Sequence, residues 1–369
     1  MLFKSFFCIV LFIFSTSAFA VTPQTKIIIF GDSLSDAGMN TSATDSGNNT
    51  WAKDQGRTGS PLTNIDSNTK TRALWVNYFI TKKFPELKIW PIRIARLKQL
   101  DIRNTSINYA YASAETGDNY LDDFVRIPFP PYVNQTCSIP GDPTPQLHCV
   151  PGILKQIDLY LSEVHHPDDQ TIFFIWAGGN DIFNNIAKLA SLLQHKQFSE
   201  LNKHLAETIN TSTSQPCAPT LFPPLSHPIL NLMNARDRLI AAGVKPSQIY
   251  FLDLPDLSKT PAAIKLANGS TTILKVVQAI TIGFNTTLKL ALMHMPFSKN
   301  NLPDSHVISI YNLLDDIIAH PAQYHFTETS KSCVDEHATP YCKNYVFFND
   351  KHPTTQAGKW IAMTVAKNM

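Results

Sequence analysis

The sequence predicts an α/β fold: a three-layer α/β/α sandwich around a central parallel sheet that is doubly wound. Short, strongly apolar runs alternate with segments of helical periodicity, which is typical of parallel sheets covered by helices. Several of the apolar runs are closed by Gly or Pro, as strands of such sheets often are. Neither an internal repeat nor a long low-complexity linker interrupts the alternation. These observations favour a single α/β domain.

Each element follows from its local pattern. Residues 26–30 are a β-branched run that ends at Gly31, and they predict a buried first strand. Residues 73–84 are amphipathic and predict a helix. By the same criteria, further strands are expected at 106–112, 171–177, 248–254 and 306–311, and further helices at 153–164, 182–193, 228–242, 272–293 and 354–365.

Two long stretches depart from the alternation. Residues 40–68 are polar and rich in Gly, Asn and Thr, and residues 124–151 carry a dense cluster of prolines. Long loops in a single domain are usually functional, and these two are expected at the carboxyl ends of strands, where open α/β sheets bind ligands. Surface decoration is the alternative for each loop.

The first twenty residues have the organisation of a secretory signal peptide. Lys4 precedes an apolar run at 6–14, and Ala18-Phe19-Ala20 supplies the small residues of a cleavage site. We therefore expect residues 1–20 to be removed and residues 21–369 to form one secreted domain, in the periplasm or outside the cell. An uncleaved membrane anchor is the alternative, but the run is short for a bilayer span.

Composition excludes some partners. The formal net charge is only +2 and charged residues are 16% of the chain, so nothing drives the protein toward nucleic acid. A polar but weakly charged surface suits an exported enzyme. The sequence leaves the oligomeric state open.

Five cysteines remain after the expected cleavage, in a compartment where disulfides persist. Sequence proximity predicts the pairs Cys137–Cys149 and Cys333–Cys342, which leaves Cys217 free. Buried unpaired thiols are the alternative. A zinc site is not expected, because no Cys-x-x-Cys motif occurs.

The first chemical motif is Gly31-Asp32-Ser33-Leu34, directly after the first predicted strand. A serine hydroxyl is a weak nucleophile that needs a sharp turn to present it and a base to activate it. Backbone N–H groups flanking such a turn face the place where an oxyanion forms. This position makes Ser33 the candidate nucleophile and its own N–H a candidate oxyanion donor.

Two further motifs supply what Ser33 needs. Asn180 follows Gly178-Gly179 at the end of the predicted strand 171–177, and its amide can donate to an oxyanion. The alternative is a plain strand-to-helix turn, in which Asn or Asp caps a helix from about residue 182. His352 precedes a Pro-Thr helix start near the C-terminus and is the candidate general base.

Together these motifs resemble the GDSL, or SGNH-hydrolase, family of lipolytic enzymes, in order and spacing from Phe30 to Thr354. The resemblance implies the flavodoxin-like SGNH fold and a catalytic pair of Ser33 and His352. It also implies an oxyanion hole made by Ser33, Asn180 and a glycine of the family's second block.

The chain departs from the family pattern at two positions. In the second block, residues 108–114, Ala112 stands at the position of the oxyanion glycine, and its backbone N–H is expected to serve instead. The family's acid lies three residues before the histidine, where this chain has Asn349. We expect Asp350 to orient His352 through a shortened turn, with Asn349 as the alternative.

The resemblance implies a secreted serine esterase that hydrolyses acyl esters of phospholipids or lysophospholipids through an acyl-enzyme, with acyl transfer to a sterol as a variant. The expected partner is a lipid ester, presented at a membrane surface, and the chemistry needs no metal or organic cofactor. One alternative is a carbohydrate acetyl esterase on the same scaffold. Another is a binding protein that has lost catalysis, suggested by Ala112 and Asn349.

Overall fold

The computed structural model describes residues 25–38, 61–117, 119–121, 149–183, 199, 228–296 and 298–369. Its centre is a six-stranded sheet in the order β2-β3-β1-β6-β7-β8, and every neighbouring pair in it is parallel. This confirms the predicted α/β class. The strands are β1 (Lys26–Gly31), β2 (Ile89–Pro91), β3 (Ser106–Asn108), β6 (Thr171–Trp176), β7 (Ile249–Leu252) and β8 (Val307–Ile308).

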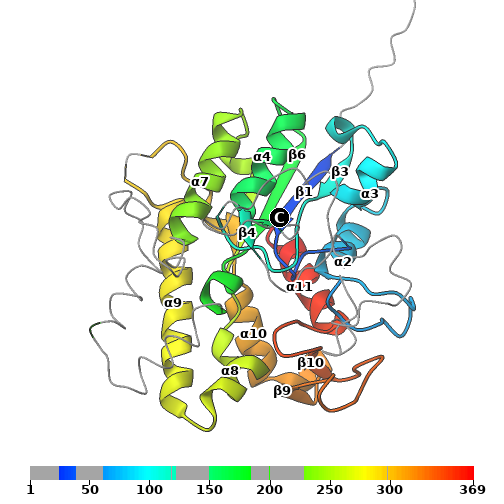
Figure 1. Cartoon of the computed structure of the whole chain (residues 1–369), viewed down its shortest axis with the longest axis vertical. Helices are drawn as coiled ribbons and strands as arrows, with labels where there is room; N and C mark the ends of the chain where they lie inside the picture. Colours follow the sequence, from blue (N-terminus) through cyan, green and yellow to red (C-terminus); the bar gives the residue numbers. More distant parts are fainter. Residues whose placement is uncertain are drawn as a thin grey trace, which may run out of the picture.

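Alternation along β1 divides the core into two layers. Ile28 and Phe30 face one cluster, whereas Ile27 and Ile29 face the other, as the two-residue period of a strand requires. Helices α4 (Ile153–Glu163), α7 (Pro228–Ala241) and α9 (Thr271–Met293) cover the first face, and α2 (Trp75–Lys83) and α11 (Thr355–Lys367) cover the second. Figure 1 shows α4, α7 and α9 to the left of the strands and α2 to the right. The result is an α/β/α sandwich.

The chain order of the strands creates a switch point beside β1. After β1 the chain builds β2 and β3 on one side, and it then returns to place β6 on the other side of β1. The last residues of the two strands, Gly31 and Trp176, are directly paired. Open α/β sheets bind ligands outside the carboxyl ends of strands at such a point. The segments that follow β1 and β6 carry Ser33 and Asn180.

Some boundaries differ from the sequence prediction. The strand expected at 306–311 is only Val307–Ile308, because α10 (Ile310–Ala319) begins there. The buried Asp253 carboxylate causes this, since it accepts hydrogen bonds from the backbone N–H groups of Ile310 (2.6 Å) and Tyr311 (2.9 Å). Burial raises the pKa of Asp253 to about 6. The helix expected from 182 begins at 179, and its described part ends at 183.

Several short elements were not predicted. They are the edge strand β2, α3 (Ile92–Leu97), α8 (Pro261–Ala267), the antiparallel pair β4 (Asn119–Leu121) and β5 (Cys149–Pro151), and the parallel pair β9 (Glu328–Ser332) and β10 (Tyr345–Phe347). Single 3₁₀ turns add η1 (Ile102–Asn104), η3 (Pro246–Gln248), η4 (Leu257–Lys259), η5 (Asp304–His306) and η6 (Pro321–Tyr324). Short segments of this kind carry too little periodicity to be recognised from sequence.

The predicted disulfide Cys333–Cys342 is confirmed, and both cysteines are buried. Residues 1–20, Cys137 and Cys217 lie outside the described residues, so the signal peptide, the pairing of Cys149 and the free thiol stay predictions. Helix α9 is long and apolar enough to cross a membrane, but half of its most apolar stretch is buried inside the fold. That burial is typical of a core helix.

Candidate active site

The turn after β1 presents Ser33. The Asp32 carbonyl accepts from the N–H groups of Ser35 (3.1 Å) and Asp36 (3.0 Å), and the Asp32 carboxylate accepts from Leu34 N (2.9 Å). Gly31 permits this tight path, because a Cβ there would lie 3.0 Å from the Trp176 carbonyl oxygen. The turn therefore leaves β1 sharply and places the Ser33 side chain beyond the edge of the sheet.

His352 contacts Ser33 from the loop between β10 and α11. Its Nε2 atom is 2.7 Å from Ser33 Oγ, although the residues are 319 positions apart. The His352 carbonyl accepts from Phe348 N at 2.8 Å, and Thr354 caps α11 by accepting from Ala357 N. Both anchors fix the loop on either side of the histidine. The structure therefore brings together the predicted nucleophile and base at hydrogen-bond distance.

Asn349, not Asp350, orients the histidine. Asn349 Oδ1 accepts from His352 Nδ1 at 2.8 Å. The Asp350 carboxylate points elsewhere and pairs with Lys265 of α8 at 2.7 Å. The prediction that Asp350 orients His352 is thus wrong, and the alternative residue Asn349 occupies that position. The reason is the geometry of the turn before His352. It brings the side chain three residues before the histidine, not the one two residues before it, back to the imidazole.

Two backbone donors decide which end of the Asn349 amide faces the histidine. Oδ1 also accepts from Lys351 N and His352 N, both at 3.0 Å. Since N–H groups cannot point at an NH₂ group, the oxygen must lie on this side. His352 Nδ1 then carries its proton, and Nε2 presents a lone pair to the Ser33 hydroxyl. The buried Asn349 Nδ2 has no hydrogen-bond partner in the described part of the chain.

The second-block donor differs from the prediction. Ala112 N donates to the Asp36 carboxylate at 2.8 Å, so it is not available to an oxyanion, and the assignment of Ala112 is wrong. The next residue, Ser113, has a left-handed backbone (φ 68°), the conformation that usually calls for glycine. No described group accepts from Ser113 N. Sequence reasoning missed Ser113, which stands where the family block has a second glycine.

Asn180 lies where the sequence placed it, next to the second-block segment. Its Nδ2 donates to the Ala114 carbonyl at 2.9 Å, which uses one of two amide hydrogens and fixes the side chain. Asp181 lies inside the helix that begins at 179, and its carboxylate accepts from the Thr116 hydroxyl at 2.7 Å and from Thr116 N at 3.1 Å. Asn180 therefore contacts the segment that contains Ser113.

Three buried carboxyl groups surround this turn. Asp32, Asp36 and Asp181 are each at most 2% exposed. Burial, with smaller contributions from Asp181 and Asp36, raises the pKa of Asp32 from 3.8 to about 7. The Asp36 carboxylate is held by Gly38 N and Ala112 N. The Ser33 turn therefore lies in an acidic, weakly solvated environment.

The pKa of Asp32 predicts a pH-dependent stability. Between about pH 4 and pH 7 the folded protein keeps a proton on Asp32 that the unfolded chain releases, so the free energy of unfolding falls as pH rises. In Asp32→Asn the amide oxygen still accepts from Leu34 N, and no proton is exchanged at this position. The free energy of unfolding of the variant therefore does not fall with pH on this account. We expect the variant to gain on the order of 3 kcal/mol relative to wild type between these pH values. Urea unfolding at several pH values measures it; parallel curves for the two proteins would contradict the assignment.

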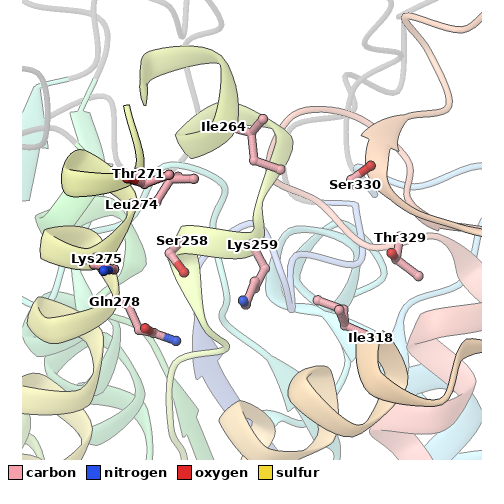
Figure 2. A pocket seen from close by; sticks show the side chains of 10 residues that line it. All are labelled: Ser258, Lys259, Ile264, Thr271, Leu274, Lys275, Gln278, Ile318, Thr329 and Ser330. Carbon is pink, nitrogen blue, oxygen red and sulfur yellow. The ribbon is translucent and has the colours of Figure 1, made fainter. Parts of the chain in front are cut away.

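A separate cavity of about 300 Å³ lies between η4, α8, α9, α10 and β9. Figure 2 shows its lining, which includes Ile264 and Lys275 but none of Ser33, Asn180, Asn349 and His352. The cavity is therefore separate from the candidate active site around Ser33. Within the described ranges, no three His, Cys, Asp or Glu side chains are grouped as metal ligands.

No protein-family model matches the chain, and no curated protein matches it significantly.

Proposed function

We propose that the protein is a serine esterase of the SGNH type that hydrolyses acyl esters of phospholipids or lysophospholipids. The observation that carries the proposal is the continuous chain Ser33 Oγ–His352 Nε2 (2.7 Å) and His352 Nδ1–Asn349 Oδ1 (2.8 Å). A hydroxyl, an imidazole and an acceptor in this order are the parts of an activated nucleophile. The resemblance of the four sequence blocks supports the same family.

In the proposed mechanism, Ser33 Oγ attacks the ester carbonyl while His352 Nε2 takes the hydroxyl proton. Asn349 keeps Nδ1 protonated, so that Nε2 is the basic atom. His352 then returns the proton to the leaving alcohol, and an acyl-Ser33 ester remains. Water, activated by the same Nε2, releases the fatty acid. A lipid alcohol in place of that water makes the enzyme an acyltransferase.

The oxyanion is assigned to three donors: Ser33 N, Ser113 N and the second hydrogen of Asn180 Nδ2. Ser33 N is not used within its own turn, and Ser113 N is the donor that follows the occupied Ala112 N–H. Preorganised donors of this kind each contribute roughly 3–4 kcal/mol of transition-state stabilisation in serine hydrolases.

Labelling with a fluorophosphonate probe tests the proposal, because the probe phosphonylates only an activated serine. We expect one adduct per chain, located on Ser33 by peptide mass spectrometry, and competition by lysophospholipid. Absence of the adduct would support the binding-protein alternative. Labelling without lipid competition, together with release of acetate from acetylated glycans, would favour the carbohydrate esterase.

A further inference from the structure

A segment distant in the sequence holds the loop that carries His352. Thr63 Oγ1 donates to the carbonyl of Pro353, directly after the histidine, at 3.1 Å. Asn64 Oδ1 accepts from the backbone N–H of Thr355 at 2.8 Å, and Asn64 Nδ2 donates to Thr355 Oγ1 at 3.1 Å. Thr63 and Asn64 are almost fully buried, at 1% and 3% exposure. Two buried polar residues therefore anchor the His352 loop on its C-terminal side.

The bond from Asn64 satisfies a need of α11. Thr354 is the N-cap of this helix, and its side chain accepts from Ala357 N. The N–H of Thr355, the first residue of α11, has no partner within the helix, because the first N–H groups of any helix lack one. Asn64 Oδ1 supplies the missing acceptor. Asn64 Nδ2 also donates to the Tyr341 carbonyl at 2.8 Å, so a donor faces the amide oxygen and an acceptor faces its nitrogen.

The chain that continues from Asn64 also contacts the nucleophile turn. It leads into α2, whose first residue Trp75 donates from Nε1 to Ser35 Oγ at 3.1 Å. Helices α2 and α11 approach closely where they begin, since a Cβ at Gly358 would lie 3.4 Å from Trp75 N. The segment from Asn64 to Trp75 is therefore in contact with both parts of the site, the turn of the nucleophile and the loop of the base.

The backbone bonds on the other side of the loop lead to a separate sheet. The His352 carbonyl accepts from Phe348 N, and Val346 O of β10 accepts from the N-cap of α11. Strand β10 pairs with β9 in a two-stranded sheet, whereas Ser33 follows a strand of the six-stranded sheet. These bonds shape the loop but do not set its distance from the nucleophile. That distance depends on α11, which packs on the six-stranded sheet, and on Asn64, which fixes the first residue of α11.

We propose that Asn64 is a positioning residue for the general base: by holding the start of α11, it keeps the His352 imidazole within hydrogen-bond distance of Ser33 Oγ. The contact that it maintains is the one of 2.7 Å between Nε2 and Oγ. Misplacement of a catalytic group by about 1 Å is enough to slow an enzyme about 100-fold. This inference rests on the proposed esterase function and adds to its site a residue outside the four sequence blocks.

A purely structural role predicts a different result. If Asn64 only caps α11, its loss lowers stability, and each folded molecule stays as active as wild type. If it positions the base, its loss lowers kcat and the rate of fluorophosphonate labelling per folded molecule. The loss also shrinks where His352 is already disoriented by Asn349→Ala, because both substitutions then remove the same geometry.

The test measures kcat and KM with p-nitrophenyl butyrate, and the folded fraction of the same preparations by circular dichroism. We expect Asn64→Ala to lower kcat by about tenfold to 100-fold per folded molecule and to keep KM within about twofold. In the Asn349→Ala background the same substitution is expected to lower kcat by less than about threefold.

Lys359→Met is the matched control. Lys359 ties Asp66, two residues after Asn64, to α11 through an ion pair of 2.6 Å, so its loss weakens the same segment at a point away from the His352 loop. We expect this variant to be less stable than wild type and to keep kcat within about twofold.

Asn64→Asp separates the bonds of the amide. A carboxylate still accepts from Thr355 N, but its second oxygen faces the carbonyls of Ile65 and Tyr341, to which Nδ2 donates in wild type. We therefore expect a lower melting temperature but a kcat within about fivefold of wild type. A loss of kcat as large as that of Asn64→Ala would contradict positioning through Thr355.

Thr63→Val gives an independent test that holds even if Asn64→Ala does not fold. It removes the hydroxyl that donates to Pro353 O and leaves the amide of Asn64 in place. The same loop then loses one of its anchors, and we expect kcat to fall by about threefold to tenfold per folded molecule.

Unchanged kcat per folded molecule in Asn64→Ala, or in Thr63→Val if the first variant does not fold, would overturn the positioning role while leaving the esterase intact. Equal losses from Asn64→Ala in the presence and absence of the Asn349 side chain would do the same. A wild-type protein that hydrolyses no ester and takes up no fluorophosphonate would instead reject the proposed function, and the positioning role with it.

Discussion

Replacement of Ser33 by Ala is expected to lower kcat for ester hydrolysis by about 10⁴-fold or more, because the atom that forms the acyl-enzyme is removed. The fold should tolerate the change, since in the described part of the chain the hydroxyl bonds to the His352 side chain alone. Steady-state hydrolysis of p-nitrophenyl butyrate and thermal unfolding of the same preparations measure both effects. His352→Ala should lose activity on a similar scale, and the double variant should be no worse than either single one, because the two groups act as a unit.

Ser35→Ala is the matched control, two residues along in the same turn. Ser35 Oγ is fully buried and accepts from Trp75 Nε1 at 3.1 Å, so its loss leaves a buried donor unpaired. We expect this variant to lose about 1–3 kcal/mol of stability and to keep kcat within about tenfold of wild type. A Ser33→Ala protein that retains a tenth of wild-type activity, or a Ser35→Ala protein that loses as much as Ser33→Ala, would refute Ser33 as nucleophile.

The location of the site was predictable because it depends on strong local patterns. Ser33 and Asn180 each follow a strand that is apolar after its first residue, and parallel strands present their carboxyl ends at one edge. His352 could be placed by the Pro-Thr helix start after it, where Thr354 does cap α11. Such patterns bring residues to one edge of a sheet without any knowledge of side-chain contacts.

The residues around these three depend on contacts that no local pattern contains. Ala112 and Ser113 are adjacent, and the sequence does not show which of their backbone N–H groups is free to donate to an oxyanion. The Asp36 carboxylate, 76 residues away, decides this by accepting from Ala112 N. Likewise, Lys265 of α8 removes Asp350 from the histidine, and α8 itself was not predicted. In both cases a carboxylate interacts with a group that is distant in the sequence.

The predicted boundary of β8 was wrong for a related reason. The apolar run 306–311 reads as one strand, yet the buried Asp253 accepts from Ile310 N and turns the run into a helix after two strand residues. A run of six apolar or neutral residues does not distinguish a strand from a strand followed by the first turn of a helix. The geometry of Ser33, Asn349 and His352 is unaffected, because β8 lies at an edge of the sheet, away from β1.

Removal of the Asn349 side chain is expected to have the second-largest effect. In Asn349→Ala, His352 Nδ1 and the N–H groups of Lys351 and His352 all lose their shared acceptor. The imidazole is then free to rotate or to exchange tautomers, so that Nε2 no longer presents a lone pair to Ser33. Loss of an orienting group with retained nucleophile and base costs about 10²- to 10⁴-fold in kcat in comparable systems. Steady-state kcat with p-nitrophenyl butyrate measures it, and the rate of fluorophosphonate labelling should fall in parallel.

Asn349→Asp separates the two contributions of this side chain. A carboxylate accepts from the same three N–H groups, removes the buried Nδ2 that has no described partner, and adds a charge opposite the imidazolium formed in the transition state. We therefore expect Asn349→Asp to match or exceed wild-type kcat, by up to about tenfold, and the acid limb of its pH–rate profile to lie at higher pH. Equal losses in the Asp and Ala variants would show that Asn349 shapes the loop only, and would place the orientation of His352 elsewhere. A gain with the Asp variant alone would instead mean that the asparagine fixes the tautomer and forgoes the charge.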